Sequence, residues 1–145
     1  GLSNANTTEV NLQTEHPVID ILEEQKNITN KGGTMRLGAY PAKIKQGSLI
    51  NSLYNSLEVS ERHRHRYEVN PKYHGILEEN GLIFSGMSPD RLLVEFIELP
   101  KEVHPYFVAT QAHPELKSSL INPAPLFRGL VEAALKREEN GPGGI

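Results

Sequence analysis

The chain has 145 residues, of which 37% are hydrophobic, and a formal net charge of -3. This length suffices for one domain with a real core and is too short for two, and the mildly acidic balance gives no indication of a nucleic acid or a membrane surface as partner. The chain has no cysteine, which excludes a disulfide framework and a thiolate metal site. It also has no apolar run of about 18 residues and no signal-peptide pattern. We therefore expect a cytoplasmic protein with one domain over residues 1–145.

Apolar runs and turn formers divide the first half of the chain into short elements. In chain order they are predicted as an ordered loop or frayed end over 1–9, a strand over 17–22, an exposed loop over 23–31, and a strand over 34–38 that continues through 42–44. Gly32 and Gly33 free the backbone before this second strand. Ser48 can cap a helix with apolar side chains on one face, namely Leu49, Ile50, Leu53, Tyr54 and Leu57.

The second half of the chain predicts three strands between two helices. Asn70 and Pro71 form a helix start, a capping side chain followed by a proline, and this short helix should end near Gly81. The predicted strands cover 82–86, 92–99 and 106–110, and the last helix covers 126–135 before a flexible tail over 141–144. The connections between these strands are too short for a crossover helix, so we expect both strand pairs to be antiparallel.

The stretch from Gln111 to Lys117, at the end of the last predicted strand, carries a candidate catalytic pair. Pro114 lacks an N–H and favours an extended conformation at His113, so the strand should end here. Side chains two apart on an extended segment point to the same side, which places His113 beside Glu115. A carboxylate next to an imidazole can hold its tautomer, as a nucleophile–base–orienter site requires. The competing interpretation is a strand end whose histidine and glutamate face solvent.

The basic run over residues 62–66 (Arg-His-Arg-His-Arg) permits four interpretations. It can be a phosphate or nucleic-acid patch, although no aromatic platform is interleaved with it. It can be a metal site with His63 and His65 as ligands, although no further ligand recurs at a typical spacing. It can be a strand with one solvated charged face. Finally, a guanidinium fork is suited to a substrate carboxylate that it binds bidentately.

Four stretches, in this order, resemble one family. They are Asn4-Ala5-Asn6-Thr7-Thr8-Glu9, Gly32-Gly33-Thr34-Met35-Arg36-Leu37-Gly38, Glu61-Arg62-His63-Arg64-His65-Arg66-Tyr67-Glu68-Val69-Asn70 and Gln111-Ala112-His113-Pro114-Glu115. Together they resemble the glutamine amidotransferase domain of the CTP synthase family, over essentially the whole chain to Arg137. The last piece is shared by all class I (triad) amidotransferases, whereas the second and third are far more specific. The resemblance implies part of a three-layer, flavodoxin-like α/β domain with antiparallel strand additions.

The resemblance also implies roles for five residues. His113 matches the general base that activates a cysteine thiol and later protonates the leaving ammonia, and Glu115 matches the carboxylate that orients this histidine. Arg66 matches the residue that grips the α-carboxylate of L-glutamine, with Tyr67 beside it, and Glu9 matches an acidic residue near the α-amino group. A zwitterionic amino acid needs one fixed cation and one fixed anion, which agrees with these roles. The rest of the basic run is expected to support the pocket or to contact another domain.

The resemblance further implies parts that these residues do not supply. In the family the nucleophile is a cysteine on a strand-to-helix turn that precedes the stretch matched by residues 4–9. We therefore expect the C-terminal part of a glutaminase domain, inactive alone, with the nucleophile segment and the synthase domain absent. The parent enzyme would hydrolyse glutamine with a Cys–His–Glu triad and supply the ammonia for ATP-dependent amination of UTP to CTP.

The expected partners follow from that parent enzyme. It would be a homotetramer that uses ATP and Mg²⁺, with GTP as allosteric activator, whereas this domain itself would hold no cofactor and no metal. The chain would contact L-glutamine, the missing part of its own domain and the synthase domain. The alternative is a glutamine-binding or regulatory interaction module that has no nucleophile.

Overall fold

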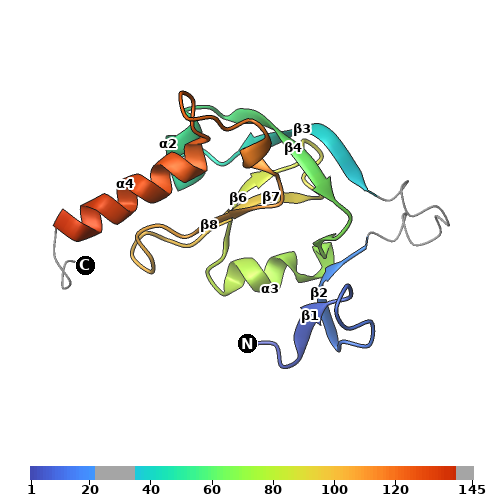
Figure 1. The fold of residues 1–145 in the computed structure, drawn as a ribbon. Helices are drawn as coiled ribbons and strands as arrows, with labels where there is room; N and C mark the ends of the chain where they lie inside the picture. The colour runs from blue at the N-terminus through green and yellow to red at the C-terminus, as the bar shows by residue number, and fades with distance from the viewer. Residues whose placement is uncertain (22–34, 140–145) are drawn as a thin grey trace.

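The computed structural model describes residues 1–21 and 35–139, which form a mixed α/β fold with two sheets (Figure 1). The strands are β1 (Ala5–Thr7), β2 (His16–Asp20), β3 (Arg36–Ile44), β4 (Glu58–His65), β5 (Glu68–Val69), β6 (Ile83–Met87), β7 (Val94–Glu98) and β8 (Val108–Thr110). The helices are α2 (Leu49–Tyr54), α3 (His74–Glu79) and α4 (Pro125–Glu139), and the 3-10 helices are η2 (Pro71–Tyr73) and η3 (Pro114–Leu116). The predictions for 23–31, Gly32, Gly33 and the tail over 141–144 lie outside the described residues.

The larger sheet is antiparallel and has the strand order β4-β3-β6-β7-β8. The strands predicted over 82–86, 92–99 and 106–110 are confirmed as β6, β7 and β8, and both pairs are antiparallel as expected. β8 begins at Val108 rather than at Tyr106, because residues 105–106 form a turn at a proline that cannot donate to a strand ladder. An isolated bridge joins His63 of β4 to Ala112 after β8, which closes the curled sheet at this edge.

The smaller sheet has the order β1-β2-β5, with β1 parallel to β2 and β5 antiparallel to it. The prediction of a loop or frayed end over 1–9 is wrong for Ala5–Thr7, which pairs with His16–Ile19. Of the three residues of β1, alanine and asparagine disfavour a strand and only the threonine favours one, so the partner strand determines the conformation. The strand predicted over 17–22 is confirmed as β2.

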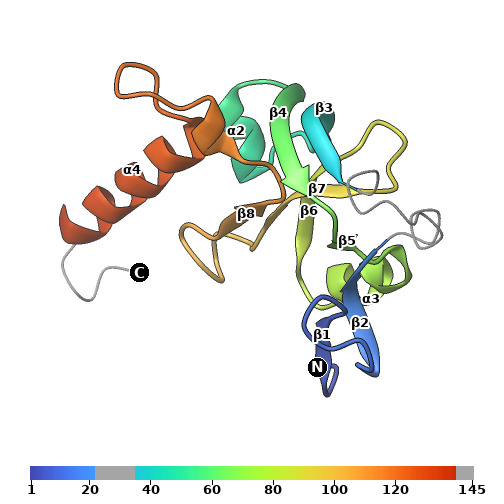
Figure 2. The same ribbon diagram turned by 45° about the vertical axis from the view of Figure 1, so that its right-hand side comes forward.

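The core lies where α2 covers the larger sheet. Ile50 of α2 is fully buried and clusters with Phe96 of β7 and with Ala42, Ile44 and Leu126. Burying an aromatic side chain of this kind contributes about 2–3 kcal/mol. α4 packs on α2 and runs away from the sheet at the end opposite β1 and β2 (Figures 1 and 2). The apolar spacing over 126–135 is thus confirmed as part of a helix.

Polar caps begin the short helices where the sequence predicts them. Ser48 Oγ accepts from the Asn51 N–H at 3.0 Å, and Asn70 Oδ1 accepts from the Lys72 N–H at 3.1 Å. α2 ends at Tyr54, because Asn55 adopts the left-handed conformation with φ 50°. Leu57 is therefore not on the helix face as predicted, and it is exposed. Of the helices in the described ranges, none is long and apolar enough to cross a membrane.

Candidate active site

His113 and Glu115 form a direct pair, in which Nδ1 of His113 lies 2.7 Å from Oε1 of Glu115. The two side chains are 38% and 54% exposed, so both can be reached from outside. A carboxylate can only accept, so Nδ1 is the nitrogen that carries the proton. In a neutral imidazole this leaves Nε2 free to take a proton as a general base. The predicted proximity of the two side chains is confirmed.

The backbone that brings the pair together differs from the extended one we predicted. The β8 ladder ends at Thr110, and Pro114 opens the 3-10 helix η3, which contains Glu115. The tight turn, rather than the two-residue period of a strand, directs the carboxylate back to the imidazole. The cause is the proline, because its fixed φ suits the first turn of a helix as well as an extended segment.

The edge of β4 holds His113 in place. The His113 N–H donates to the Arg62 carbonyl at 2.7 Å, and Lys117 Nζ donates to the Ser60 carbonyl at 2.6 Å. Together with the bridge between His63 and Ala112, these bonds fasten the segment after β8 to the strand that carries the basic run. The backbone of the basic run therefore positions the His113–Glu115 pair.

The charge state of the pair follows from its hydrogen bond. The bond from His113 lowers the pKa of Glu115 below its ordinary value. The carboxylate is therefore ionised at neutral pH. This is the electrostatic condition that a general base and its orienting carboxylate require.

The other predicted site residues lie on two separate turns. Arg66 and Tyr67 follow β4, and both are partly buried. Glu9 is exposed after β1, and its N–H donates to Thr7 Oγ1 at 3.2 Å. The hydrogen bond of the Glu9 N–H is thus local, and it is separate from the His113–Glu115 pair. Thr8, which precedes Glu9, and Tyr67, which follows Arg66, both line a cavity of about 380 Å³.

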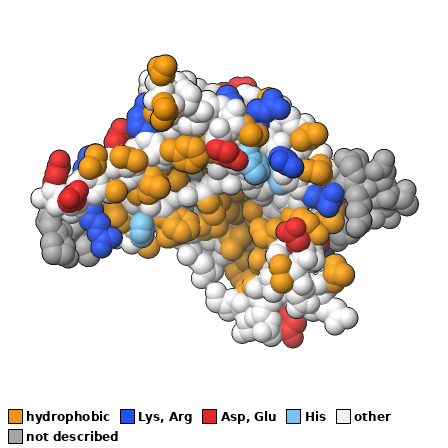
Figure 3. All heavy atoms as spheres, viewed as in Figure 1, with side chains coloured by type: hydrophobic (Ala, Val, Ile, Leu, Met, Phe, Trp, Pro, Cys, Tyr) orange, Lys and Arg blue, Asp and Glu red, His pale blue; other side chains and the backbone are white. Residues whose placement is uncertain are grey.

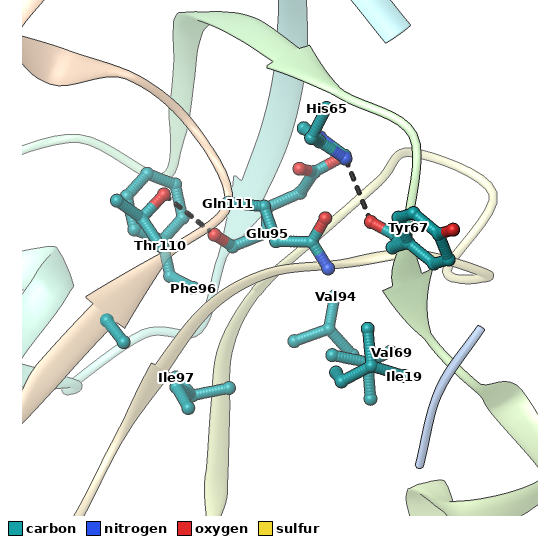
Figure 4. Close-up of a pocket in the computed structure, with 11 residues that line it drawn as sticks. Ile19, His65, Tyr67, Val69, Val94, Glu95, Phe96, Ile97, Thr110 and Gln111 are labelled. Atoms are coloured by element: carbon teal, nitrogen blue, oxygen red, sulfur yellow. Dashed lines mark hydrogen bonds between the residues drawn. The ribbon is translucent and has the colours of Figure 1, made fainter. Parts of the chain in front are cut away.

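A second cavity, of about 360 Å³, lies between the two sheets. In the space-filling view, apolar side chains surround a hollow at the centre of the face (Figure 3). The close-up shows apolar side chains from β2, β5 and β7 on one side, and His65, Glu95 and Gln111 on the other (Figure 4). Tyr67 lines this cavity as well as the first, and Gln111 lies two residues before His113. An apolar hollow with a few convergent polar groups is the usual form of a ligand site.

A buried polar cluster that the sequence analysis did not identify lies beside this cavity. Arg36 contacts Glu95 at 2.8 Å and Glu68 at 3.5 Å, and both carboxyl groups are almost fully buried. His63 and His65 complete the cluster, with 2.9 Å between Nδ1 of His63 and Nε2 of His65. One signal was present in the sequence, since Glu95 interrupts the apolar strand between Val94 and Phe96.

Burial controls the ionisation of this cluster. It raises the pKa of Glu68 to about 7 and raises the pKa of Glu95, while Arg36 opposes both shifts. Burial also lowers the pKa of His63 to about 3 and that of His65 to about 4. Both imidazoles are therefore neutral at pH 7. Strongly shifted groups next to a cavity are a common mark of a functional site.

The structure bears on two of the interpretations of the basic run. Arg62 and Arg64 are exposed, whereas Glu61 and His63 are buried, so residues 58–65 form a strand with one solvated charged face. The metal interpretation is not supported, because the described residues contain no group of three or more metal-ligating side chains. His63 and His65 instead bond to each other, which is expected of buried imidazoles without a metal.

A comparison with protein families assigns the chain. The family described as Glutamine amidotransferase class-I matches residues 4–133, which is most of the chain. The chain belongs to the class I glutamine amidotransferase family. The mixed fold with its curled antiparallel sheet agrees with this family, and the predicted fold class is confirmed.

Similar class I amidotransferases include CTP synthases from several organisms. The chain is 63% identical over 134 residues to CTP synthase of Methanococcus maripaludis, a match that covers 92% of the chain and 25% of that protein. It is 59% identical over 140 residues to CTP synthase of Nocardia farcinica, covering 94% of the chain and 24% of that protein. The chain thus spans about a quarter of the length of the curated relatives it matches. The predicted resemblance to the CTP synthase family is confirmed.

A solved structure of the same family gives the spatial comparison. The glutaminase domain of Trypanosoma brucei CTPS with bound acivicin superposes with a TM-score of 0.83 and 37% identity. The match covers 94% of this chain and 53% of that chain. The described fold therefore corresponds to about half of that glutaminase domain.

Proposed function

We propose that this chain supplies the His–Glu pair and part of the glutamine pocket of a glutaminase site in a CTP synthase. The contact of 2.7 Å between His113 and Glu115 carries this proposal, within a chain that belongs to the amidotransferase family. The nucleophile would be a cysteine from outside these residues, because the 145 residues contain none. The chain alone would therefore lack glutaminase activity.

In the proposed reaction, His113 moves protons at Nε2. It takes the proton from the cysteine thiol, and the thiolate attacks the side-chain carbonyl of glutamine. The same nitrogen then protonates the leaving ammonia, and a thioester remains. Water, deprotonated by His113, hydrolyses the thioester and releases glutamate. Glu115 would keep the imidazole in the productive tautomer and stabilise its charged form.

The α-carboxylate of glutamine would bind to Arg66, with Tyr67 beside it. A guanidinium can hold a carboxylate with two parallel hydrogen bonds, which fixes the direction of the substrate. Glu9 would face the α-amino group, and its position next to the cavity shared by Thr8 and Tyr67 is compatible with this role. The ammonia would pass to a synthase domain outside this chain, which would activate UTP with ATP and Mg²⁺. GTP would be the allosteric activator of the parent enzyme.

The test uses the CTP synthase polypeptide that carries this chain and compares two nitrogen sources. Arg66→Ala should raise the KM for glutamine by roughly 10- to 100-fold, the effect of losing a charge-assisted hydrogen bond. CTP formation from free ammonia should change far less. Arg128→Ala is the matched control, since it removes a surface arginine that pairs with Glu132. Equal losses with both nitrogen sources would contradict the proposed role.

A further inference from the structure

Glu95 lies at the centre of the buried polar cluster, and its two carboxyl oxygens contact different members of it. Its Oε1 accepts from Arg36 Nη2 at 2.8 Å, and its Oε2 lies 3.5 Å from Nε2 of His63. Its backbone carbonyl accepts from Thr110 Oγ1 at 2.9 Å and from the Gln111 N–H at 3.2 Å. The residue therefore connects the strand before His113 with the histidines of the basic run.

The two histidines form a hydrogen-bond chain with a single permitted direction. The Tyr67 carbonyl can only accept, so Nδ1 of His65, 3.0 Å away, must carry a hydrogen (Figure 4). A neutral His65 then has a bare Nε2, which must accept from Nδ1 of His63 at 2.9 Å. A neutral His63 in turn has a bare Nε2. The series of hydrogen bonds thus begins at Nε2 of His63, an acceptor that needs a donor.

The group that faces this bare nitrogen is the Oε2 of Glu95, which lacks any other partner in the described part of the chain. Two bare acceptors would repel each other here, so a proton belongs between them. Burial makes protonation of His63 unfavourable and protonation of Glu95 favourable. Above about pH 7, where Glu68 is ionised, this one carboxylate is enough to balance the guanidinium of Arg36.

The remaining neighbours are consistent with a proton on Glu95 rather than on Glu68. Oε1 of Glu68 lies 3.5 Å from Nη1 of Arg36 and 3.5 Å from Nδ1 of His65, and both nitrogens carry hydrogens, so this carboxyl group faces donors. Tyr40 contributes an aromatic face, with its ring 4.4 Å from the Arg36 guanidinium and 5.6 Å from the His63 ring. Glu95, in contrast, faces an acceptor, Nε2 of His63.

We propose that Glu95 is a positioning residue whose neutral carboxyl group donates to Nε2 of His63 and so fixes the hydrogen-bond chain that ends on the Tyr67 carbonyl. This series of hydrogen bonds holds the turn over residues 65–67, which carries Arg66. The inference rests on the proposed function, because the turn matters for catalysis only if Arg66 binds glutamine. Glu95 acts through the histidines and contacts no reacting atom.

Two conservative substitutions in the CTP synthase polypeptide separate a neutral Glu95 from an ionised one. Glu95→Gln keeps the length, and its amide can accept from Arg36 and donate to His63, so the KM for glutamine should stay within about twofold. Glu95→Asp shortens the side chain by one methylene and loses contact with His63, so this KM should rise about tenfold. The kcat should change little in either variant, because ground-state positioning is what is removed.

The opposite ranking of the two variants by their KM for glutamine would overturn the inference. An Asp variant near wild type with an impaired Gln variant would mean an ionised Glu95 beside a charged His63. Two unaffected variants, or two equally impaired ones, would also contradict a donated hydrogen bond as the requirement. Glu98→Gln and Glu98→Asp are matched controls on the same strand, since Glu98 is also buried but bonds to α2, and neither should change the KM for glutamine.

Arg66→Ala distinguishes failure of the inference from failure of the proposed function. If this variant has no selective effect on glutamine, the proposed pocket is wrong, whatever the Glu95 variants do. If it raises the KM for glutamine and the Glu95 variants follow the wrong order, the pocket stands and only the role of Glu95 falls.

Discussion

Nδ1 of His113 and Oε1 of Glu115 are 2.7 Å apart although the residues are only two positions apart on a tight turn. The pair is held from the side by the Arg62 carbonyl, which accepts from the His113 N–H at 2.7 Å. The imidazole is therefore fixed by its own backbone and by its carboxylate partner. Its other ring nitrogen, Nε2, remains available for proton transfer.

Replacing Glu115 by glutamine should reduce glutamine-dependent turnover while it leaves the fold intact. The amide cannot stabilise an imidazolium, and loss of an orienting carboxylate costs roughly 10² to 10⁴-fold in kcat. The measurement is kcat with glutamine and with free ammonia in the complete enzyme. Glu58→Gln is the matched control, since Glu58 pairs with Lys43 and its side chain is also 54% exposed. A loss as large in the control would contradict a specific role.

The buried Glu68 should make stability depend on pH in a defined direction. Burial raises its pKa to about 7 from an ordinary value of 4.5, so between these values the folded state holds a proton that the unfolded state has released. The contribution of Glu68 to stability is thus full below about pH 4.5 and is lost as the pH rises to about 7. Glu68→Gln removes this dependence, because the amide does not titrate.

The measurement is the free energy of unfolding of the chain and of Glu68→Gln by urea at several pH values. The wild-type value minus the variant value should increase as the pH falls from about 7 to about 4.5, by up to about 1.4 kcal/mol per pH unit. His63 and His65 work in the opposite sense, because their lowered pKa values remove stability as the pH falls below 6.5. Both are present in the two proteins, so the difference isolates Glu68 together with its contact with His65, which lies 3.5 Å away. A difference that grows with rising pH would refute the assignment.

The sequence analysis recovers the elements that local signals specify. β6 and β7 follow from apolar runs between turn formers, and the starts of α2 and η2 follow from the caps Ser48 and Asn70. β1 was missed, because three small and polar residues become a strand only by pairing with β2. Such non-local pairing leaves no periodic pattern in the strand itself.

The candidate site likewise contains residues that a local motif predicts and residues that only the assembled sheet brings together. The His113–Glu115 pair was predictable because both members belong to one short motif. The cluster around Glu95 was not, since Arg36, His63 and Glu68 come together only when β3, β4, β5 and β7 are assembled. The roles of Arg66, Tyr67 and Glu9 remain predictions that the kinetic tests above address.

A buried carboxylate from β7 caps α2, and its loss should destabilise the fold. The N–H groups of Leu49 and Ile50 donate to the two carboxylate oxygens of Glu98 at 2.8 and 3.1 Å. Glu98→Ala leaves both donors buried and should lower the free energy of unfolding by about 2–3 kcal/mol, against about 1 kcal/mol for Ser48→Ala. Urea unfolding of both variants tests the ranking, with the exposed Glu102→Ala as the control. Equal effects of the Glu98 and Glu102 variants would contradict the cap.

The same substitution in two helices should have opposite effects. In α3, a Cβ at Gly75 would meet nothing within 4 Å, so Gly75→Ala should stabilise the fold by about 0.5–1 kcal/mol through helix propensity alone. In α4, a Cβ at Gly129 would lie 2.5 Å from Leu53 Cδ2 and 2.9 Å from Tyr106 Cε2. Tyr106 is fixed there, because its hydroxyl donates to the Leu126 carbonyl at 2.5 Å. Gly129→Ala should therefore destabilise the fold by about 1–3 kcal/mol despite the better propensity of alanine. Urea midpoints of the two variants decide the matter: a stabilised Gly129→Ala would mean that α4 does not pack closely on α2 and Tyr106.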